Sequence, residues 1–208
     1  MITRRRLMIG CAAAALMPTA VIYAAAPLIQ QIRERLHDAP VLRGKFEQRK
    51  TLRGFRHDLL SGGDFVLARS HGMYWHTAQP FESTLIITPD RILSRHSDGS
   101  AAPYLDVKQE PGLRIINELL FALLAADLQT LTTHFHVAGS LNGDGSWRLA
   151  LNPKDPALTQ WLSQVLLEGD KYVREIVLDE ASGDRSAIHL TQHSTTARLS
   201  AGEAAHFD

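Results

Sequence analysis

Short segments of alternating apolar and polar residues recur along most of this chain, and they restrict its fold more than any other feature. They span 41–52, 59–69, 73–77 and 85–93, and strand-like patterns resume at 133–139, 146–151, 158–168, 172–179 and 186–193. Successive residues of a strand point to opposite faces, so each segment can present one apolar face. The connections are short and rich in Gly, Pro and Asp, as antiparallel hairpins require. The pattern predicts a mainly-β protein with helices (α+β) and about 11 antiparallel strands.

Two segments depart from this alternation and predict helices. Apolar residues at helical spacing between Leu28 and Leu36 follow Pro27, and Pro40 ends the element. The second helix, 112–126, is apolar around most of its surface, so it must be buried. It is too short to span a bilayer. Two interpretations remain open for it: an ordinary core helix, or a helix that closes the mouth of a curved sheet above a lipid cavity.

The first residues have the pattern of an export signal. Arg4, Arg5 and Arg6 precede an apolar run from 7 to 16, and alanines at 24–26 offer small residues for cleavage. We therefore predict a signal peptide over 1–26, one domain over 27–208, and a periplasmic location. The general secretory route and the twin-arginine route both remain open. The only cysteine, Cys11, lies in this leader, so the exported chain would contain no thiol.

Charge and motifs argue against several functional classes. The chain has 22 basic and 22 acidic residues, and loss of the three leader arginines would leave it acidic, which disfavours nucleic-acid binding. No phosphate loop, dinucleotide fingerprint or Gly-x-Ser-x-Gly elbow occurs, so we predict no cofactor and no enzymatic activity. His134 and His136 would share a strand face, but two ligands do not make a zinc site, and we predict no metal. His189 and His193 would also share a face, as exposed residues.

Three short motifs, in order, support a family resemblance. Residues 44–50 read GKFEQRK, 61–65 read SGGDF, and 69–75 read RSHGMYW before Gln79-Pro80. Together they resemble consecutive strands of the LolA-type periplasmic lipoprotein carriers. The resemblance implies an incomplete antiparallel β-barrel with an α-helical lid over an apolar cavity. It also implies a monomer that takes acyl chains from an inner-membrane donor, touches membranes transiently, and delivers its cargo to an outer-membrane acceptor.

The resemblance also implies roles for single residues. Arg69 matches the family arginine whose hydrogen bonds to the lid backbone hold the carrier shut. The fixed fork of guanidinium donors suits such a latch. Alternation along the strands and the apolar helix supply the candidates for the lipid-binding cavity, which are Phe46, Phe65, Leu67, Met73, Trp75, Leu85, Ile87, Leu119, Leu120 and Leu123.

The sequence departs from the family at two places. Ser70 replaces the proline that follows the arginine, and 88–96, reading TPDRILSRH, lacks the aromatic pair of the corresponding strand. The cavity wall is therefore altered, and a lipoprotein, a glycolipid or an apolar pigment remain possible cargoes. Three alternatives to a shuttle also stay open: a static periplasmic lipid-binding accessory protein, a structural β-domain of an envelope complex, and an esterase with a Ser–His pair in the cavity.

Overall fold

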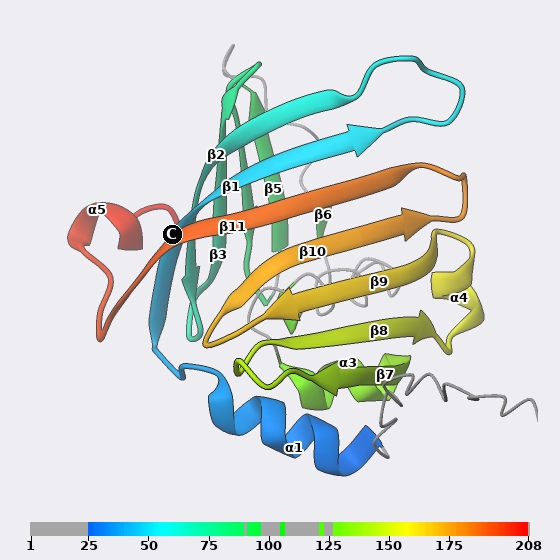
Figure 1. The fold of residues 1–208 in the computed structure, drawn as a ribbon. Helices are drawn as coiled ribbons and strands as arrows, with labels where there is room; N and C mark the ends of the chain where they lie inside the picture. The colour runs from blue at the N-terminus through cyan, green and yellow to red at the C-terminus, as the bar shows by residue number, and fades with distance from the viewer. Residues whose placement is uncertain (1–24, 90, 97–104, 107–120, 123–126, 208) are drawn as a thin grey trace, which may run out of the picture.

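The fold is a single curved, antiparallel sheet. The computed structural model describes residues 25–89, 91–96, 105–106, 121–122 and 127–207. Its strands are β1 (Val41–Thr51), β2 (Leu59–Ala68), β3 (Gly72–Gln79), β4 (Ser83–Ile87), β5 (Arg91–His96), β6 (Leu105–Asp106), β7 (Phe135–Leu141), β8 (Trp147–Pro153), β9 (Leu162–Gly169), β10 (Val173–Glu180) and β11 (Arg185–Thr196). They form an 11-stranded sheet in the order β6-β5-β4-β3-β2-β1-β11-β10-β9-β8-β7 (Figure 1).

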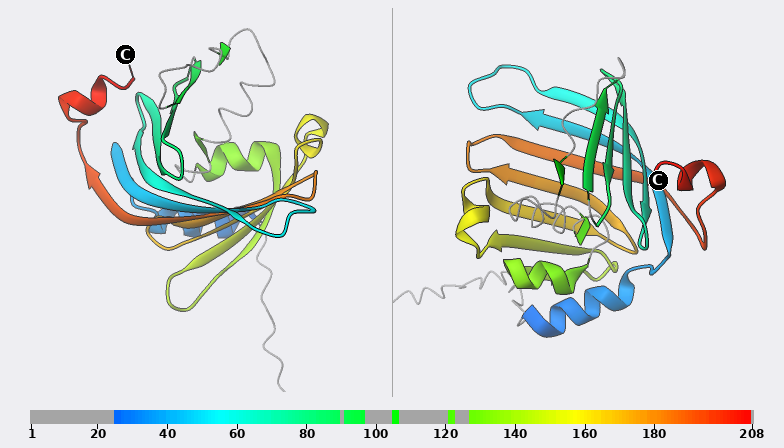
Figure 2. Two further views of the ribbon diagram at one scale, coloured as in Figure 1. Left: turned by 90° about the horizontal axis from the view of Figure 1, so that it is seen from above. Right: turned by 180° about the vertical axis from the view of Figure 1, so that it is seen from behind.

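The sheet does not close into a full barrel. Its edge strands, β6 and β7, do not pair with each other within the described part of the chain, and every neighbouring pair is antiparallel. The first and last long strands, β1 and β11, lie side by side at the middle of the sheet. The view from above shows the resulting bend, with α3 inside the curve (Figure 2). This arrangement confirms the predicted open antiparallel fold.

Within the described ranges, the helices whose bounds are defined are α1 (Ala25–Arg35), α3 (Leu128–His134), α4 (Pro156–Thr159) and α5 (Ala201–Ala204). Helix α1 is the predicted first helix, and it packs beside β7 together with α3 (Figure 2). Of the second predicted helix, only Phe121 and Ala122 are described, and both are helical. Among the described helices, none has the length and hydropathy needed to cross a bilayer.

The boundaries of two predicted strands were wrong. The strand predicted from residue 133 begins at Phe135, because Asp127 caps the start of α3 and this helix continues to His134. The Asp127 carboxylate accepts hydrogen bonds from the backbone N and the hydroxyl of Thr130. The strand predicted over 158–168 begins at Leu162, because Asp155 and Pro156 start the short helix α4. In both cases a helix that begins at a capping aspartate occupies the first residues of the predicted strand.

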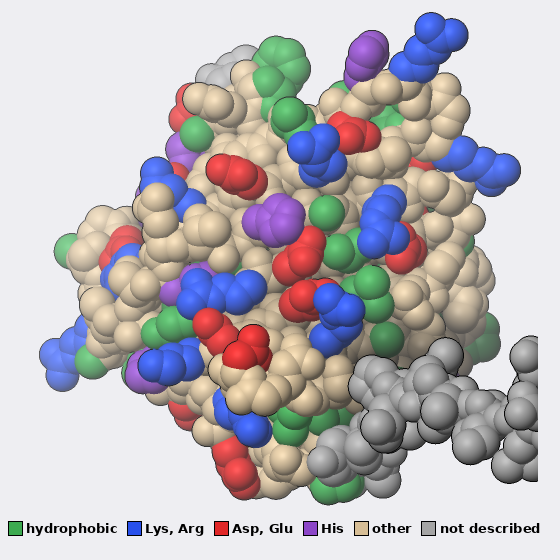
Figure 3. All heavy atoms as spheres, viewed as in Figure 1, with side chains coloured by type: hydrophobic (Ala, Val, Ile, Leu, Met, Phe, Trp, Pro, Cys, Tyr) green, Lys and Arg blue, Asp and Glu red, His purple; other side chains and the backbone are tan. Residues whose placement is uncertain are grey.

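The outer face of the sheet carries charges in cross-strand rows. Arg148 pairs with Glu168 at 2.6 Å, and Glu175 lies 3.6 Å from His189 on the next pair of strands. Figure 3 shows basic, acidic and histidine side chains mixed over these strands. Such exposed pairs contribute little to stability. Their charges favour contact with water, so they help to orient this face of each strand away from the core.

The C-terminal segment covers the remaining apolar area of the outer face. Phe207 packs on a small buried cluster formed by Val41, Val66, Ala68 and Ile86. Helix α5 is anchored there by the carboxylate of Glu203, which accepts hydrogen bonds from the Arg43 guanidinium and from the backbone N of Ser200. Bonding to Arg43 lowers the pKa of Glu203 to about 2.

This ion pair predicts a pH-dependent contribution to stability. Because the folded pKa of Glu203 lies below its ordinary value of 4.5, the contribution is complete above that value and is lost as pH falls towards 2. We expect Arg43→Met to lower the free energy of unfolding by about 1–2 kcal/mol at pH 7. Urea titrations of both proteins should show this difference shrinking below pH 4.5.

Arg198→Met is the control, because Arg198 is an exposed arginine of the same segment. It should change stability by less than about 0.5 kcal/mol at either pH. An Arg43→Met difference that stays constant across this pH range would show that the lost stability comes from packing and not from the Glu203 charge.

Candidate functional site

The inner, concave face of the sheet is the candidate site. The predicted cavity residues from the strands all join one hydrophobic cluster, namely Phe46, Phe65, Leu67, Met73, Trp75, Leu85 and Ile87. Strand register explains this, because Phe65 pairs with Trp75 and Trp75 pairs with Leu85 across three successive strands. The other predicted members, Leu119, Leu120 and Leu123, lie outside the described residues. That the cluster contacts a lipid remains a prediction.

Aromatic rings form the centre of this cluster. The rings of Phe46 and Trp75 stack with centroids 3.8 Å apart, and Phe65 lies 5.9 Å from Trp75. Glycines make room for them. Gly44 lies against the Phe65 ring, where an added Cβ would come within 2.7 Å of ring carbons. Phe46 pairs with Gly63, which has no side chain to separate the rings. The glycines of the sequence motifs thus allow close aromatic packing on the inner face.

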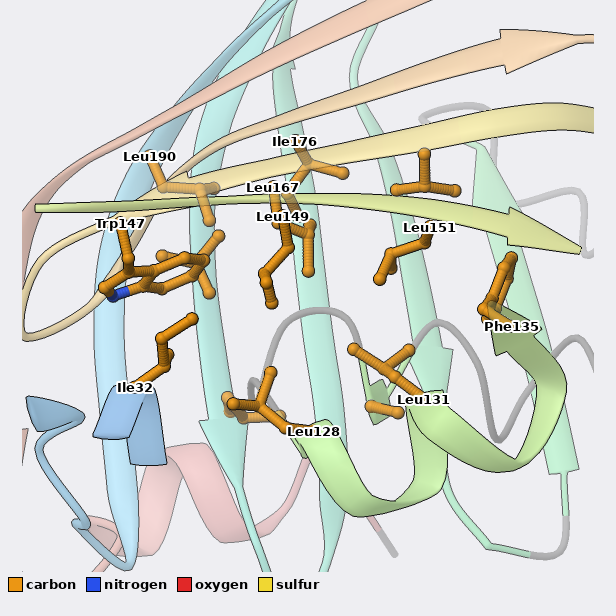
Figure 4. Close-up of a cluster of buried hydrophobic side chains, with 14 of the residues drawn as sticks. Ile32, Leu128, Leu131, Phe135, Trp147, Leu149, Leu151, Leu167, Ile176 and Leu190 are labelled. Carbon is orange, nitrogen blue, oxygen red and sulfur yellow. The ribbon is translucent and has the colours of Figure 1, made fainter. Parts of the chain in front are cut away.

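The two ends of the concave face differ in what covers them. On strands β8 and β9, Leu149, Leu151, Val165 and Leu167 are completely buried. Figure 4 shows Ile32 of α1 and Leu128 and Leu131 of α3 near this group. This part is therefore filled by the protein's own side chains. On strands β3 and β4, by contrast, Trp75 and Leu85 are only partly buried. The sequence pattern did not indicate this asymmetry, because it predicts a strand from residue 133 and no helix over 128–134.

Arg69 lies just beyond the end of β2 and contacts the segment between α1 and β1. Its Nε donates to the carbonyl of Ala39 at 3.2 Å, and its guanidinium lies 2.9 Å from the Asp38 carboxylate. Its backbone N also donates to the carbonyl of Pro40. These bonds join the end of β2 to the chain that leaves α1. The predicted latch role is untested, but the side chain does bond to backbone next to a covering helix.

A groove with charged walls crosses strands β1, β2, β3 and β11. It has a volume of about 690 Å³, and Lys45, Glu47, Arg49 and His189 are among the residues that border it. By strand alternation Lys45, Glu47 and Arg49 lie on the face opposite Phe46. Phe46 of the predicted cavity also borders the groove, so the groove adjoins that cavity at β1. The charged walls make the groove itself unsuitable for an alkyl chain.

One histidine has an environment that the sequence did not predict. An extra residue in β11, near Gln192 with its φ of 52°, shifts the pairing with β1, so His189 and His193 do not share a face. His193 stacks on Tyr172 at 4.8 Å, and its Nδ1 lies 3.0 Å from an Arg174 nitrogen. Burial, reinforced by the Arg174 charge, lowers the pKa of His193. The prediction that His193 is an exposed residue was wrong.

The predicted pair of histidines at 134 and 136 does not share a strand face. His134 ends α3 and His136 lies in β7, so they are not on one strand face as predicted. Within the described ranges, no group of three or more His, Cys, Asp or Glu residues is placed to hold a metal ion. Ser70 and His71 share a hydrogen bond of 2.9 Å, but both are exposed in the β2–β3 turn, away from the concave face.

The position of Arg69 generates a test of the latch. We expect Arg69→Leu to bind an acyl-chain probe with wild-type affinity but to transfer it to acceptor vesicles about tenfold more slowly, because the closed, cargo-free form would lose the two side-chain bonds of Arg69 to Ala39 and Asp38. The control is Asp38→Ser, which removes only the exposed ion pair and should transfer normally. Normal transfer by Arg69→Leu would contradict the latch.

Comparison with known proteins agrees with this architecture. The family model described as "Outer membrane lipoprotein carrier protein LolA" matches residues 38–203. No curated protein matches the sequence.

Similar solved structures include a LolA superfamily protein from Nitrosomonas europaea, with 12% identity, a TM-score of 0.49, and coverage of 89% of this chain and 98% of that one. A DUF1329 family protein from Desulfovibrio piger has 10% identity and a TM-score of 0.49, covering 88% and 95%. The MucA/MucB complex of Pseudomonas aeruginosa has 15% identity and a TM-score of 0.47, covering 86% and 59%. The family match spans most of the sheet, and the chain therefore belongs to the LolA family of outer membrane lipoprotein carriers.

Proposed function

We propose that this protein is a periplasmic carrier that binds the acyl chains of a lipoprotein, or of another lipid-like cargo, and moves it from the inner to the outer membrane. Membership of the LolA family supports this role. The observation that carries the proposal is the continuous apolar inner face, on which Trp75 and Leu85 remain partly exposed beside the fully buried Phe46 and Ile87.

The energetics of lipid transfer explain why such a face is needed. Each methylene removed from water contributes about 0.8 kcal/mol, so an acyl chain of about 16 carbons costs roughly 10 kcal/mol or more to expose. A carrier with an apolar surface compensates that cost during the crossing. Exchange between one apolar environment and another then has a small net cost, so no chemical step is required.

The proposal assigns the binding region to one end of the sheet. Because α1 and α3 fill the concave face over β8 and β9, the acyl chain would lie over β1 to β4, against Phe46, Trp75 and Leu85. Aromatic rings and branched aliphatic side chains bind alkyl chains without selecting their length. Export by a signal over 1–26, a single mature domain over 27–208, donor and acceptor proteins in the two membranes, and a monomeric state belong to the same proposal.

Native mass spectrometry of the exported protein is the direct experiment. We expect a fraction of molecules to carry an added mass that extraction identifies as a lipid or an acylated peptide. Incubation with acceptor vesicles should then remove this mass from the protein. Retention of the lipid in the presence of vesicles would indicate a static lipid-binding protein, and a preparation that neither carries nor takes up lipid would contradict the carrier.

A pair of variants on one strand tests the binding face. Trp75→Ala should weaken binding of a fluorescent acyl-chain probe about tenfold, because the indole presents a large apolar surface to the site. Tyr74→Ala is the control, since Tyr74 points to the opposite face and stacks on His206. Probe titrations should show wild-type affinity for this control, and equal losses in both variants would contradict binding on the inner face.

A further inference from the structure

The tip of the β1–β2 hairpin combines basic and apolar residues in an unusual density. Residues 49–60 read RKTLRGFRHDLL, with four Lys or Arg against a single acid, Asp58. Three large apolar side chains of this segment are mostly exposed, with exposed fractions of 72% for Phe55, 57% for Leu59 and 58% for Leu60. We call residues 49–60 the hairpin tip.

The hairpin tip exposes apolar side chains on both of its faces. Leu59 and Leu60 are neighbours in β2, so their side chains point to opposite faces, yet both are more than half exposed. Lys50 and Arg49 pair with them across the hairpin. Figure 1 shows the tip at the same edge of the sheet as the β10–β11 turn and α4, and Figure 3 shows basic and histidine side chains protruding in the region of the tip. A partner that surrounds the tip would therefore bury more of its apolar surface than a partner that covers one face.

A fourth exposed apolar residue lies at the same end of the sheet. Trp161, with an exposed fraction of 71%, accepts at its carbonyl a hydrogen bond from the backbone N of Ala181 in the β10–β11 turn. The same turn contacts the hairpin tip, because the backbone N of Arg53 donates to the Asp184 carboxylate at 2.8 Å. The hairpin tip and Trp161 therefore both contact this turn, which places two exposed aromatic residues, Phe55 and Trp161, at the same end of the sheet.

The charges of the hairpin tip leave a positive surface. Asp58 is engaged by Arg49 at 2.9 Å and by the hydroxyl of Thr51, and Lys50 is paired with Glu180 at 2.8 Å. The Asp184 carboxylate adds a negative charge at the base of the tip, where it accepts a hydrogen bond from the backbone N of Arg53 and forms no ion pair with a tip side chain. Among the described residues, the guanidinium groups of Arg53 and Arg56 have no ion pair within 4 Å. Two arginines thus flank Phe55 with their charge uncompensated, which is the arrangement that attracts phosphate groups.

We propose that the hairpin tip and Trp161 form a docking site for a bilayer surface that contains anionic phospholipids. Phe and Trp rings favour the interfacial region of a bilayer, and arginines beside them pair with lipid phosphates. A bilayer can contact both faces of the tip at once, whereas a protein groove would cover one face. This inference rests on the proposed carrier role for its purpose, since docking would bring the inner face close to the membrane that supplies or receives the acyl chain.

Vesicle binding of the exported protein tests the docking site. We expect flotation with vesicles of phosphatidylcholine and phosphatidylglycerol, weakened by salt, and much less with pure phosphatidylcholine. A surface arginine contributes about a fivefold factor in binding, so Arg53→Ser/Arg56→Ser should lose about 25-fold on the anionic vesicles. Phe55→Ser should weaken binding about tenfold on the same vesicles.

A second measurement uses tryptophan fluorescence. Brominated lipids should quench the emission of Trp161, and Trp161→Phe should abolish this quenching, because Trp147 is buried and Trp75 is partly buried.

Matched controls separate the hairpin tip from other exposed residues. Phe81→Ser removes an equally exposed aromatic from the β3–β4 turn, and Arg198→Ser removes an arginine near the C-terminus. Both should bind vesicles like the wild type. Equal losses in these controls, or wild-type binding by the tip variants, would overturn the docking site, and so would an absence of vesicle binding in the unmodified protein.

A separate measurement distinguishes failure of docking from failure of the carrier proposal. Binding of a soluble acyl-chain probe without vesicles should be unchanged in the tip variants, because the tip lies outside the inner cluster. If the wild type floats with anionic vesicles but binds no acyl probe, docking stands and the carrier proposal fails. If the wild type binds the acyl probe but does not float with anionic vesicles, the carrier proposal stands and the docking site fails.

Discussion

The structure depends on burying the inner face of one bent antiparallel sheet. Strand alternation places Phe46, Phe65 and Trp75 on that face, and the sheet is too open for its own edges to cover them. An apolar area of this size cannot stay in water without a large cost in free energy. Helices α1 and α3 cover the part of the inner face that β8 and β9 form. The part around Trp75 and Leu85 is less buried, and the carrier proposed above would hold its acyl chain there.

The two faces of the sheet are stabilised by different means. The inner face packs branched and aromatic side chains, with glycines admitting rings where two side chains would otherwise collide. The outer face is held by exposed ion pairs, which add little, and by the C-terminal segment, whose Glu203 carboxylate joins Arg43 to the cap of α5. The terminal helix therefore protects Phe207 and its neighbours from water without touching the inner face.

This separation bears on the proposed carrier role. If the inner face opens to exchange cargo, as proposed, the second cluster on the outer face would keep the sheet intact meanwhile. Arg69 connects the sheet to the chain next to a covering helix, because it bonds from the end of β2 to the segment that follows α1. The hairpin tip is at the opposite end of β2, so the proposed docking surface and the proposed latch occupy the two ends of one strand.

The sequence by itself determined the sheet, its antiparallel order, the first helix, and which strand residues from 46 to 87 share a face, because a period of two fixes sidedness wherever register is regular. Tertiary structure decided the rest. The cap formed by Asp127 and the bulge at Gln192 are local events that break the period and move His134 and His193. Leu128 and Leu131 fill part of the inner face, and Arg53 bonds to Asp184 in the 181–184 turn. Both contacts join residues far apart in the chain, which no local pattern encodes.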